Sequence, residues 1–282
     1  MRYFYLVGKI LIVLFATIGM VFTFIFFGIR YGWTNVKGTI KERNDSFLEN
    51  LPKQKSINEI INGVQYPHYA WEDSAEWQVM KTVFIRDKDI INKASIDAGI
   101  SPRILLGGII GEQFRFFTNS RDSFKKYFEP LKILASLSKF SYGIAGLKPD
   151  TVARIDVNLK NPNSVFYLGT DMENIVTYPD GADITKTQFD RITDVKNPYY
   201  SYLYTGLFMR QVTMQWNASG VDISNNPGVL STLYNLGFNR SIPKLNPVAG
   251  GAIITIDGTE YSFGQLGDEF YYSAELREEF PQ

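Results

Sequence analysis

An uncharged apolar run of 20 residues, from Ile10 to Ile29, constrains this chain more than any other feature of its sequence. At a rise of about 1.5 Å per residue, a helix of that length crosses a hydrocarbon core of about 30 Å. A cleaved signal peptide is the alternative, but its apolar region usually has about 7–15 residues and ends at small residues. Because this run is longer and continues into bulky residues, we predict that residues 1–33 form an uncleaved transmembrane anchor.

Positive charges flank the run on both sides, so the charge bias alone does not fix its orientation. Arg2 and Lys9 precede the run, whereas Arg30 and Lys37 follow it. The short N-terminal tail and the large polar body favour a single-pass anchor in the cytoplasmic membrane, with the body on the extracytoplasmic side. Residues 34–69 are polar and of mixed charge, which predicts a stalk or linker.

The composition of the chain argues against several kinds of site. There is no cysteine, which excludes disulfides, thiol nucleophiles and zinc–cysteine sites. His68 is the only histidine, which argues against a Ser-His-Asp triad or a multi-histidine metal site, and we interpret it as structural. We therefore expect no metal and no cofactor. Basic and acidic residues balance, and a body without excess positive charge is a poor match to nucleic acid.

Local signals predict that most of the body is helical. The segment from Ala70 to Ala98 has a helical pattern, with two helices meeting near Arg86 and Asp87. A capping residue directly before a proline predicts three further helix starts, at Ser101-Pro102, Asn197-Pro198 and Asn226-Pro227.

The C-terminal part of the chain changes from helical to strand signals. Alternating apolar residues on both sides of Asp257-Gly258 predict a β-hairpin with a type I′ turn. The predicted fold is therefore mainly α, with a helical domain over residues 70–245 and a small β-hairpin extension over residues 246–282.

The sharpest anomaly in the helical part is Glu112, at the end of an almost uncharged helix that begins near Pro102. It shares a face with Leu105 and Ile109, because the three residues lie at i, i+4 and i+7. A carboxyl group held against apolar neighbours has its pKa raised, which suits a general acid at neutral pH. The alternative is that Glu112 marks the exposed end of a core helix, because most glutamates are solvated.

Glycines in the same helix are a second anomaly, since each destabilises a helix by about 1 kcal/mol relative to alanine. They are Gly107, Gly108 and Gly111. We expect the missing side chains to allow another backbone to approach this helix closely.

Three motifs in order along the chain resemble those of the lysozyme-like superfamily, with lytic transglycosylases and goose-type lysozymes as its nearest members. The first is AGISPRIL with the Gly-Glu pair that ends at Glu112, the second is SYGIAGLKPDTV at 141–152, and the third is STLYNLG at 231–237. The resemblance covers roughly residues 90–240. It implies that residues 70–245 form a lysozyme-like α+β catalytic domain.

The resemblance implies a peptidoglycan lytic transglycosylase, which cleaves the β-1,4 bond between N-acetylmuramic acid and N-acetylglucosamine. Glu112 would be its single acid and base: it protonates the glycosidic oxygen and then takes a proton from the muramyl 6-hydroxyl, giving a 1,6-anhydro product. The implied partners are peptidoglycan glycan strands, together with the membrane that holds the anchor. The residues implied for substrate binding are Gln113, Ser141, Gly146, Tyr234 and Asn235.

Two positions depart from the family pattern. Gly146 stands where the family has glutamine, and Gln113 stands where serine is common. These departures leave open a non-catalytic homologue that binds peptidoglycan or acts as a scaffold. A hydrolytic lysozyme is a third alternative, because a second carboxylate across the groove would activate water. The candidates for that carboxylate are Asp122, Asp150 and Asp156.

Overall fold

The computed structural model describes residues 60–61, 64–118 and 143–282, together with residues 9, 15–17, 19, 20 and 23. Those few N-terminal positions are helical. Among the described residues, no helix combines the length and the apolar character needed to cross a membrane. Most of the predicted anchor at 1–33 and of the predicted stalk at 34–69 lies outside the described residues.

The protein is mainly helical, with a small antiparallel β-hairpin near the C-terminus, as the sequence predicts. The strands pair as two hairpins, β1 (Ile60–Ile61) with β2 (Val64–Gln65) and β3 (Ile253–Ile256) with β4 (Thr259–Ser262). The 3₁₀-helices are η1 (Ala70–Asp73), η3 (Thr170–Met172) and η4 (Phe238–Arg240). The α-helices are α3 (Ala75–Arg86), α4 (Lys88–Ala98), α5 (Pro102–Thr118), α8 (Pro149–Leu159), α9 (Ile184–Thr193), α10 (Tyr199–Ala218), α11 (Pro227–Leu236) and α12 (Phe263–Tyr272).

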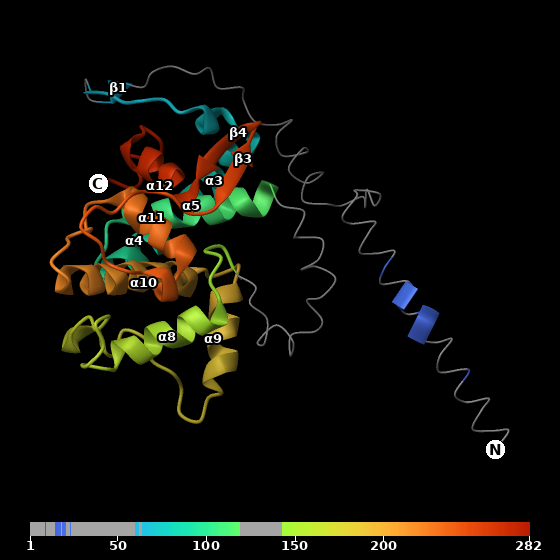
Figure 1. Ribbon diagram of the computed structural model, residues 1–282, viewed down its shortest axis with the longest axis vertical. Coiled ribbons are helices and arrows are strands. Elements are labelled where there is room, and N and C mark those ends of the chain that lie inside the picture. The colour runs from blue at the N-terminus through green and yellow to red at the C-terminus, as the bar shows by residue number, and fades with distance from the viewer. Residues whose placement is uncertain are drawn as a thin grey trace.

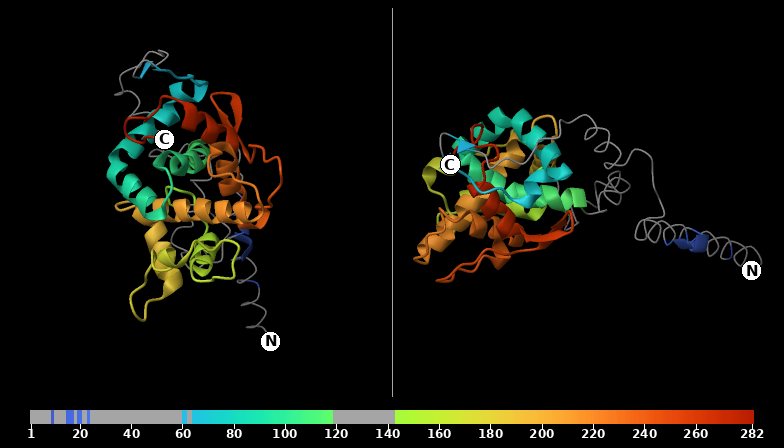
Figure 2. Two further views of the ribbon diagram at one scale, coloured as in Figure 1. Left: turned by 90° about the vertical axis from the view of Figure 1, so that its left-hand side faces the viewer. Right: turned by 90° about the horizontal axis from the view of Figure 1, so that it is seen from above.

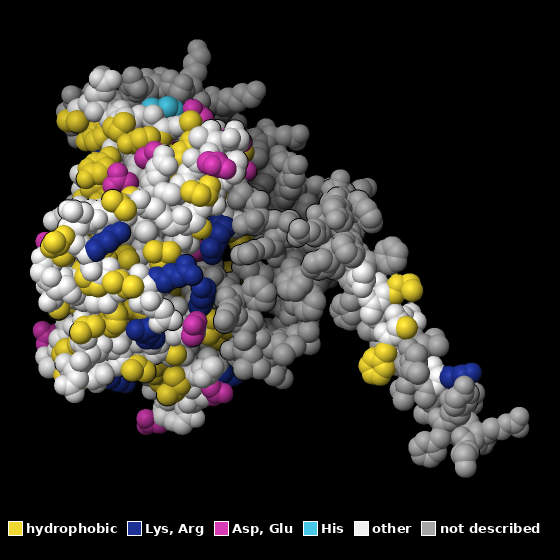
Figure 3. Space-filling model, in the orientation of Figure 1, with side chains coloured by type: hydrophobic (Ala, Val, Ile, Leu, Met, Phe, Trp, Pro, Cys, Tyr) yellow, Lys and Arg dark blue, Asp and Glu magenta, His cyan; other side chains and the backbone are white. Residues whose placement is uncertain are grey.

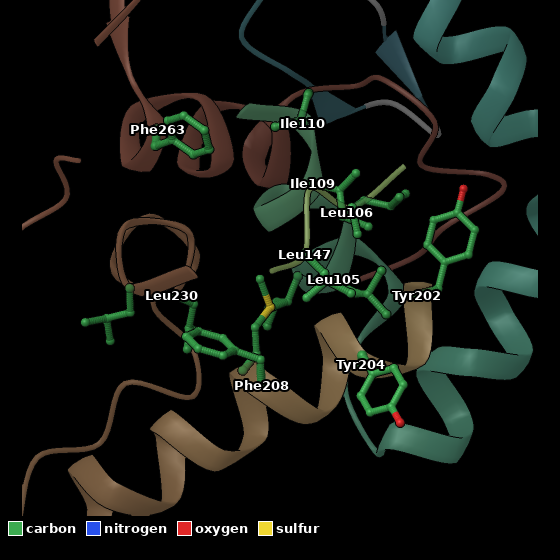
Figure 4. Packing of buried hydrophobic residues seen from close by; sticks show 14 of the residues in the cluster. Leu105, Leu106, Ile109, Ile110, Leu147, Tyr202, Tyr204, Phe208, Leu230 and Phe263 are labelled. Atoms are coloured by element: carbon green, nitrogen blue, oxygen red, sulfur yellow. The ribbon is translucent and has the colours of Figure 1, made fainter. Parts of the chain in front are cut away.

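The long helix α10 organises the body. Figures 1 and 2 show it crossing the molecule, with α8 and α9 on one side and α4, α5 and α11 on the other. Because neighbours surround it, α10 is buried on most of its faces, including Tyr202, Leu207 and Trp216. Figure 4 shows that its side chains join those of α5, such as Leu105 and Ile109, in one apolar cluster. This cluster is the core on which the candidate site is built.

Local capping explains where several helices begin and end. Helix α3 ends at Arg86 and α4 begins at Lys88, so the predicted junction between two helices is confirmed. At the start of α11, the Asn226 side chain accepts a hydrogen bond from the amide of Val229 at 3.0 Å. The same helix stops at Gly237, whose φ of +78° lies in the region that favours glycine.

The glycines of α5 make room for its neighbours, which confirms the predicted close approach. A Cβ atom on Gly267 of α12 would lie 2.9 Å from the carbonyl oxygen of Gly107 and would also overlap Ser231 of α11. A Cβ atom on Gly111 would lie 2.5 Å from the ring of Phe263. Helices α5, α11 and α12 therefore meet at one crossing that has no space for a further methyl group.

The C-terminal hairpin turns at Asp257 and Gly258, whose φ angles of +47° and +84° fit the predicted type I′ turn. The hairpin leads into α12 (Phe263–Tyr272), a helix that the sequence pattern does not predict. This helix packs against α5 and α11, so residues 246–282 contribute part of the same core as residues 70–245. Its buried side chains include Phe263, Leu266 and Phe270.

Arg103 of α5 fixes the end of α12. Its side chain is 0% exposed. Burial lowers the pKa of Arg103 to about 9, so the group is charged at neutral pH. Its guanidinium donates hydrogen bonds of 2.5 to 2.8 Å to the backbone carbonyl groups of Phe270, Tyr271, Ser273 and Glu275. One charged side chain thus binds carbonyl groups that have no hydrogen-bond partner within the helix at its end.

Candidate functional site

Glu112 lies in the second half of α5, and the residue is only 8% exposed. The residues that share its face, Leu105 and Ile109, are fully buried. The carboxylate is therefore held against the core, as the main prediction expects. The alternative prediction, an exposed glutamate at the end of a core helix, is wrong.

A tight turn at residues 143–146 lies directly against this carboxylate. The amide of Gly146 donates a hydrogen bond to the carbonyl of Gly143 at 3.3 Å, and the two φ angles are +64° and +70°. A Cβ atom on Gly146 would lie 2.5 Å from Oε2 of Glu112 and 2.9 Å from its Cδ. The second sequence motif therefore meets the glutamate of the first, and glycine is the residue that permits this approach.

Two side chains hold successive carbonyl groups of the turn. The amide nitrogen of Gln113 donates a hydrogen bond to the carbonyl of Ile144. The hydroxyl of Tyr234 donates to the carbonyl of Ala145 at 2.6 Å. Gln113 is adjacent to Glu112 on α5, whereas Tyr234 comes from α11 and belongs to the third motif. The structure thus brings together Glu112, Gln113, Gly146 and Tyr234.

The Tyr234 hydroxyl is well suited to donate. Its oxygen lies 3.1 Å from Oγ1 of Thr205 on α10, and its ring packs edge-on against Phe208 with 5.4 Å between ring centres. Burial raises the pKa of Tyr234, and the nearby charge of Glu112 raises it further. The phenol therefore keeps its proton at neutral pH and remains a donor to the turn.

Arg115 is a part of the site that the sequence analysis does not predict. Its guanidinium donates to Oε2 of Glu112 and lies 5.4 Å from the centre of the Phe263 ring. A guanidinium favours the ionised carboxylate, whereas burial disfavours it. Glu112 therefore has a charged neighbour in addition to the apolar neighbours that the sequence predicts. The i, i+3 spacing on a helix is the sequence signal that points to this pair.

Of the two other residues implied for substrate binding, the structure describes only Asn235. The side-chain oxygen of Asn235 accepts a hydrogen bond from the amide of Ala252 at 2.9 Å, so it supports the segment that enters β3. Ser141 lies outside the described residues, which resume at Gly143.

Two of the three candidates for a second carboxylate, Asp150 and Asp156, have roles of their own in the fold. Asp150 is exposed in the first turn of α8, where an acidic residue suits the helix dipole. Oδ2 of Asp156 accepts hydrogen bonds from Tyr178, from Gln188 at 2.6 Å and from Tyr204 at 3.3 Å. Asp156 thus ties α8 to α9 and α10. Asp122 lies outside the described residues.

The site has neither a metal-binding cluster among the described residues nor a match among known proteins. Within the part of the chain that the structure describes, no group of three or more acidic or histidine side chains is arranged to hold a metal ion. No protein-family model, curated protein or solved structure matches the chain.

Proposed function

We propose that this chain is a peptidoglycan lytic transglycosylase with a lysozyme-like catalytic domain. One observation carries the proposal: Glu112 of α5, Gly146 of the turn and Tyr234 of α11 meet at one point. These residues come from three segments that are far apart in the sequence. They are also the residues to which the three motifs assign the site, which supports an active site over three unrelated packing features.

In the proposed reaction Glu112 acts twice. Its protonated carboxyl group donates to the glycosidic oxygen between N-acetylmuramic acid and N-acetylglucosamine as the C1–O bond breaks. The resulting carboxylate then accepts a proton from the muramyl 6-hydroxyl, whose oxygen bonds to C1 and closes the 1,6-anhydro ring. Glu112 ends the cycle protonated, as it began, and no water is consumed.

Arg115 suits the second half of this cycle, because its guanidinium stabilises the ionised carboxylate that serves as the base. Burial of the carboxyl group works in the opposite direction and favours the protonated form that serves as the acid. These opposing influences allow one glutamate to act in both roles.

Gln113 and Tyr234 act as positioning residues in this proposal. Each donates to a backbone carbonyl of the turn, Gln113 to Ile144 and Tyr234 to Ala145. They therefore set the distance between the turn and Glu112. Gln113 and Gly146 therefore depend on each other in this proposal. Gln113 holds the turn close to Glu112, and at that distance residue 146 has no room for a side chain.

The location of peptidoglycan, outside the cytoplasmic membrane, agrees with the membrane anchor that the sequence predicts. We propose a single-pass anchor within residues 1–33 in the cytoplasmic membrane, with the catalytic body on the extracytoplasmic side. Support for this comes from the uncharged run at 10–29, which is long enough to span a bilayer, and from the location of the substrate.

Glu112→Gln in the full-length protein tests the proposed activity. We expect no release of soluble muropeptides from purified sacculi, because an amide cannot donate the required proton, and a cooperative thermal unfolding transition that shows an intact fold. Glu260→Gln, at an exposed position of β4, is the matched control and should retain activity. Release by Glu112→Gln would contradict the assignment.

Mass spectrometry of the products separates the lytic reaction from hydrolysis. An anhydro end lacks one water relative to the reducing end that a lysozyme leaves.

A peptidoglycan-binding protein without activity is the second candidate. The ion pair between Glu112 and Arg115 favours it, because the guanidinium holds the carboxylate in its ionised form. Such a protein would sediment with sacculi and release nothing.

A further inference from the structure

His68, the only histidine of the chain, lies between two carboxylates. Its Nδ1 is 3.0 Å from Oε2 of Glu72, and its Nε2 is 2.9 Å from Oδ2 of Asp73. A neutral imidazole has one donor nitrogen and one acceptor nitrogen. Both contacts are therefore favourable only when this cluster holds an additional proton, either on the second ring nitrogen or on one of the carboxyl groups.

The cluster lies on the segment that joins the N-terminal part of the chain to the helical body. We call residues 64–74, which include β2 and η1, the strap. Trp71 anchors the strap: its side chain is 0% exposed, and its indole nitrogen donates to Glu269 of α12 at 2.9 Å. The same indole packs against Phe114, with 6.1 Å between ring centres. Phe114 comes two residues after Glu112, so the strap supports the end of α5 that carries the candidate site.

Acidic groups surround the cluster. Glu72 is 5% exposed and accepts a hydrogen bond from the amide of Tyr69 at 3.1 Å. Two cations also face the strap in the described structure: Lys81 of α3 pairs with Glu275 at 2.8 Å, and Arg277 lies 4.2 Å from the ring of Tyr66. The other titratable groups that face it come from α12 and the residues after it, and they are Asp268, Glu269, Tyr272 and Glu275. A proton lost from the cluster therefore leaves carboxylates close to one another.

We infer that His68 is a pH-sensitive catch, which holds the strap against the body while its cluster is protonated and releases the strap as the pH rises above neutral. This inference does not depend on the proposed enzymatic activity.

The direction of the pH effect is the same for both partners. The hydrogen bond to Asp73 raises the pKa of His68 above its ordinary 6.5, and burial raises the pKa of Glu72 to about 7. Both groups thus bind their protons more tightly in the folded than in the unfolded state. Their stabilisation of the strap is present at lower pH and is lost as the pH rises through these values.

The single histidine allows a direct test on the full-length protein. With carbon-13-labelled histidine, the spectrum contains one imidazole signal. We expect its titration midpoint above 6.5, the ordinary value for histidine. A midpoint at or below that value would overturn the inference.

Hydrogen exchange of the strap tests the release itself. Between about pH 6 and about pH 8.5, we expect protection of residues 64–74, corrected for intrinsic rates, to fall about tenfold per unit by which the pKa is raised. In His68→Gln protection should be weak at both pH values. In Glu72→Gln protection should persist at the higher pH, because no buried carboxylate forms there.

Lys186→Gln, which removes an exposed ion pair with Asp190, is the control and should behave as the wild type. Constant protection in the wild type, or an undiminished pH response in His68→Gln, would overturn the inference. Neither result bears on whether Glu112 cleaves glycan. Conversely, if the wild type releases no muropeptides but its strap loses protection as the pH rises, only the proposed function is refuted.

Discussion

Gly146 shows how little space separates the turn from the carboxylate of Glu112. Alanine at this position places a Cβ atom 2.5 Å from Oε2, so either the turn or the Glu112 side chain must move. We expect the rate of muropeptide release by Gly146→Ala to fall by about 100-fold, because small displacements of catalytic groups have effects of that size.

The matched control for this variant is Gly220→Ala. Gly220 has a φ of +80° and no atom within 4 Å of its Cβ position. Both substitutions impose the backbone strain of a left-handed alanine, about 1–2 kcal/mol. Only Gly146→Ala should lose activity, and equal activity in the two variants would show that contact with Glu112 is unimportant.

Arg115 gives a second prediction at the residue scale. The rate of a reaction that needs protonated Glu112 falls on the alkaline side of its pH profile. Without the guanidinium the ionised form loses this stabilising charge, so in Arg115→Met the falling limb should move to higher pH. Arg154→Met removes a guanidinium that binds Asn239 instead and should leave the limb in place.

The sequence predicts the types of residue in the site better than their contacts. The motifs select Glu112, Gly146 and Tyr234, which the structure brings together. They do not show that Gln113 donates to a backbone carbonyl or that Arg115 binds the carboxylate, since these contacts depend on how two chain segments approach each other. The role of Gly146 also becomes clear only from the space around it.

At the scale of helices and strands, the crossing of α5 and α12 depends on glycine in both partners. Gly267→Ala adds a methyl group that overlaps Ser231 and lies 2.9 Å from a backbone oxygen of Gly107. Overpacking of this kind typically destabilises by about 1–3 kcal/mol, which outweighs the helix propensity gained by alanine. We expect urea unfolding to show that loss.

Gly250→Ala is the control for the crossing, because no atom lies within 4 Å of its Cβ position. Its free energy of unfolding should stay within about 0.5 kcal/mol of the wild type. A stable Gly267→Ala variant would mean that the helices can separate without cost.

Elements whose signals are local are the ones that the sequence predicts. The junction between α3 and α4, the start of α11 at Asn226 and the turn at Asp257-Gly258 each depend on residues adjacent in the chain. Helix α12 has a local start signal in Ser262, whose side chain accepts a hydrogen bond from the amide of Gln265 at 3.1 Å, but Gly264 and Gly267 interrupt its pattern and its burial comes from contacts with α5 and α11. Tertiary packing therefore decides its structure.

For the whole molecule, Arg103 connects the middle of the chain to its end. Arg103→Met removes the hydrogen bonds that the buried guanidinium donates to carbonyl groups around the end of α12, so we expect global destabilisation by about 3 kcal/mol. Arg240→Met, at an exposed position of η4, should unfold like the wild type. Thermal unfolding of both variants checks this, and local loss at the C-terminus alone would contradict it.

The same long-range contact explains why overall assembly is harder to predict than individual helices. The acceptors of Arg103 are separated from it by roughly 170 residues, and nothing near position 103 in the sequence indicates them. The balance of charges and the apolar content predict only that a core forms, not which segments build it.

The clamp of Arg103 on the last turn of α12 also has a consequence during synthesis. Until residues 263–275 have been translated, the buried cation of α5 lacks its acceptors, and the gap beside Gly107 lacks the backbone of Gly267. The nascent chain therefore lacks part of its core until α12 has been made, and truncation before residue 263 should yield misfolded rather than merely shortened protein.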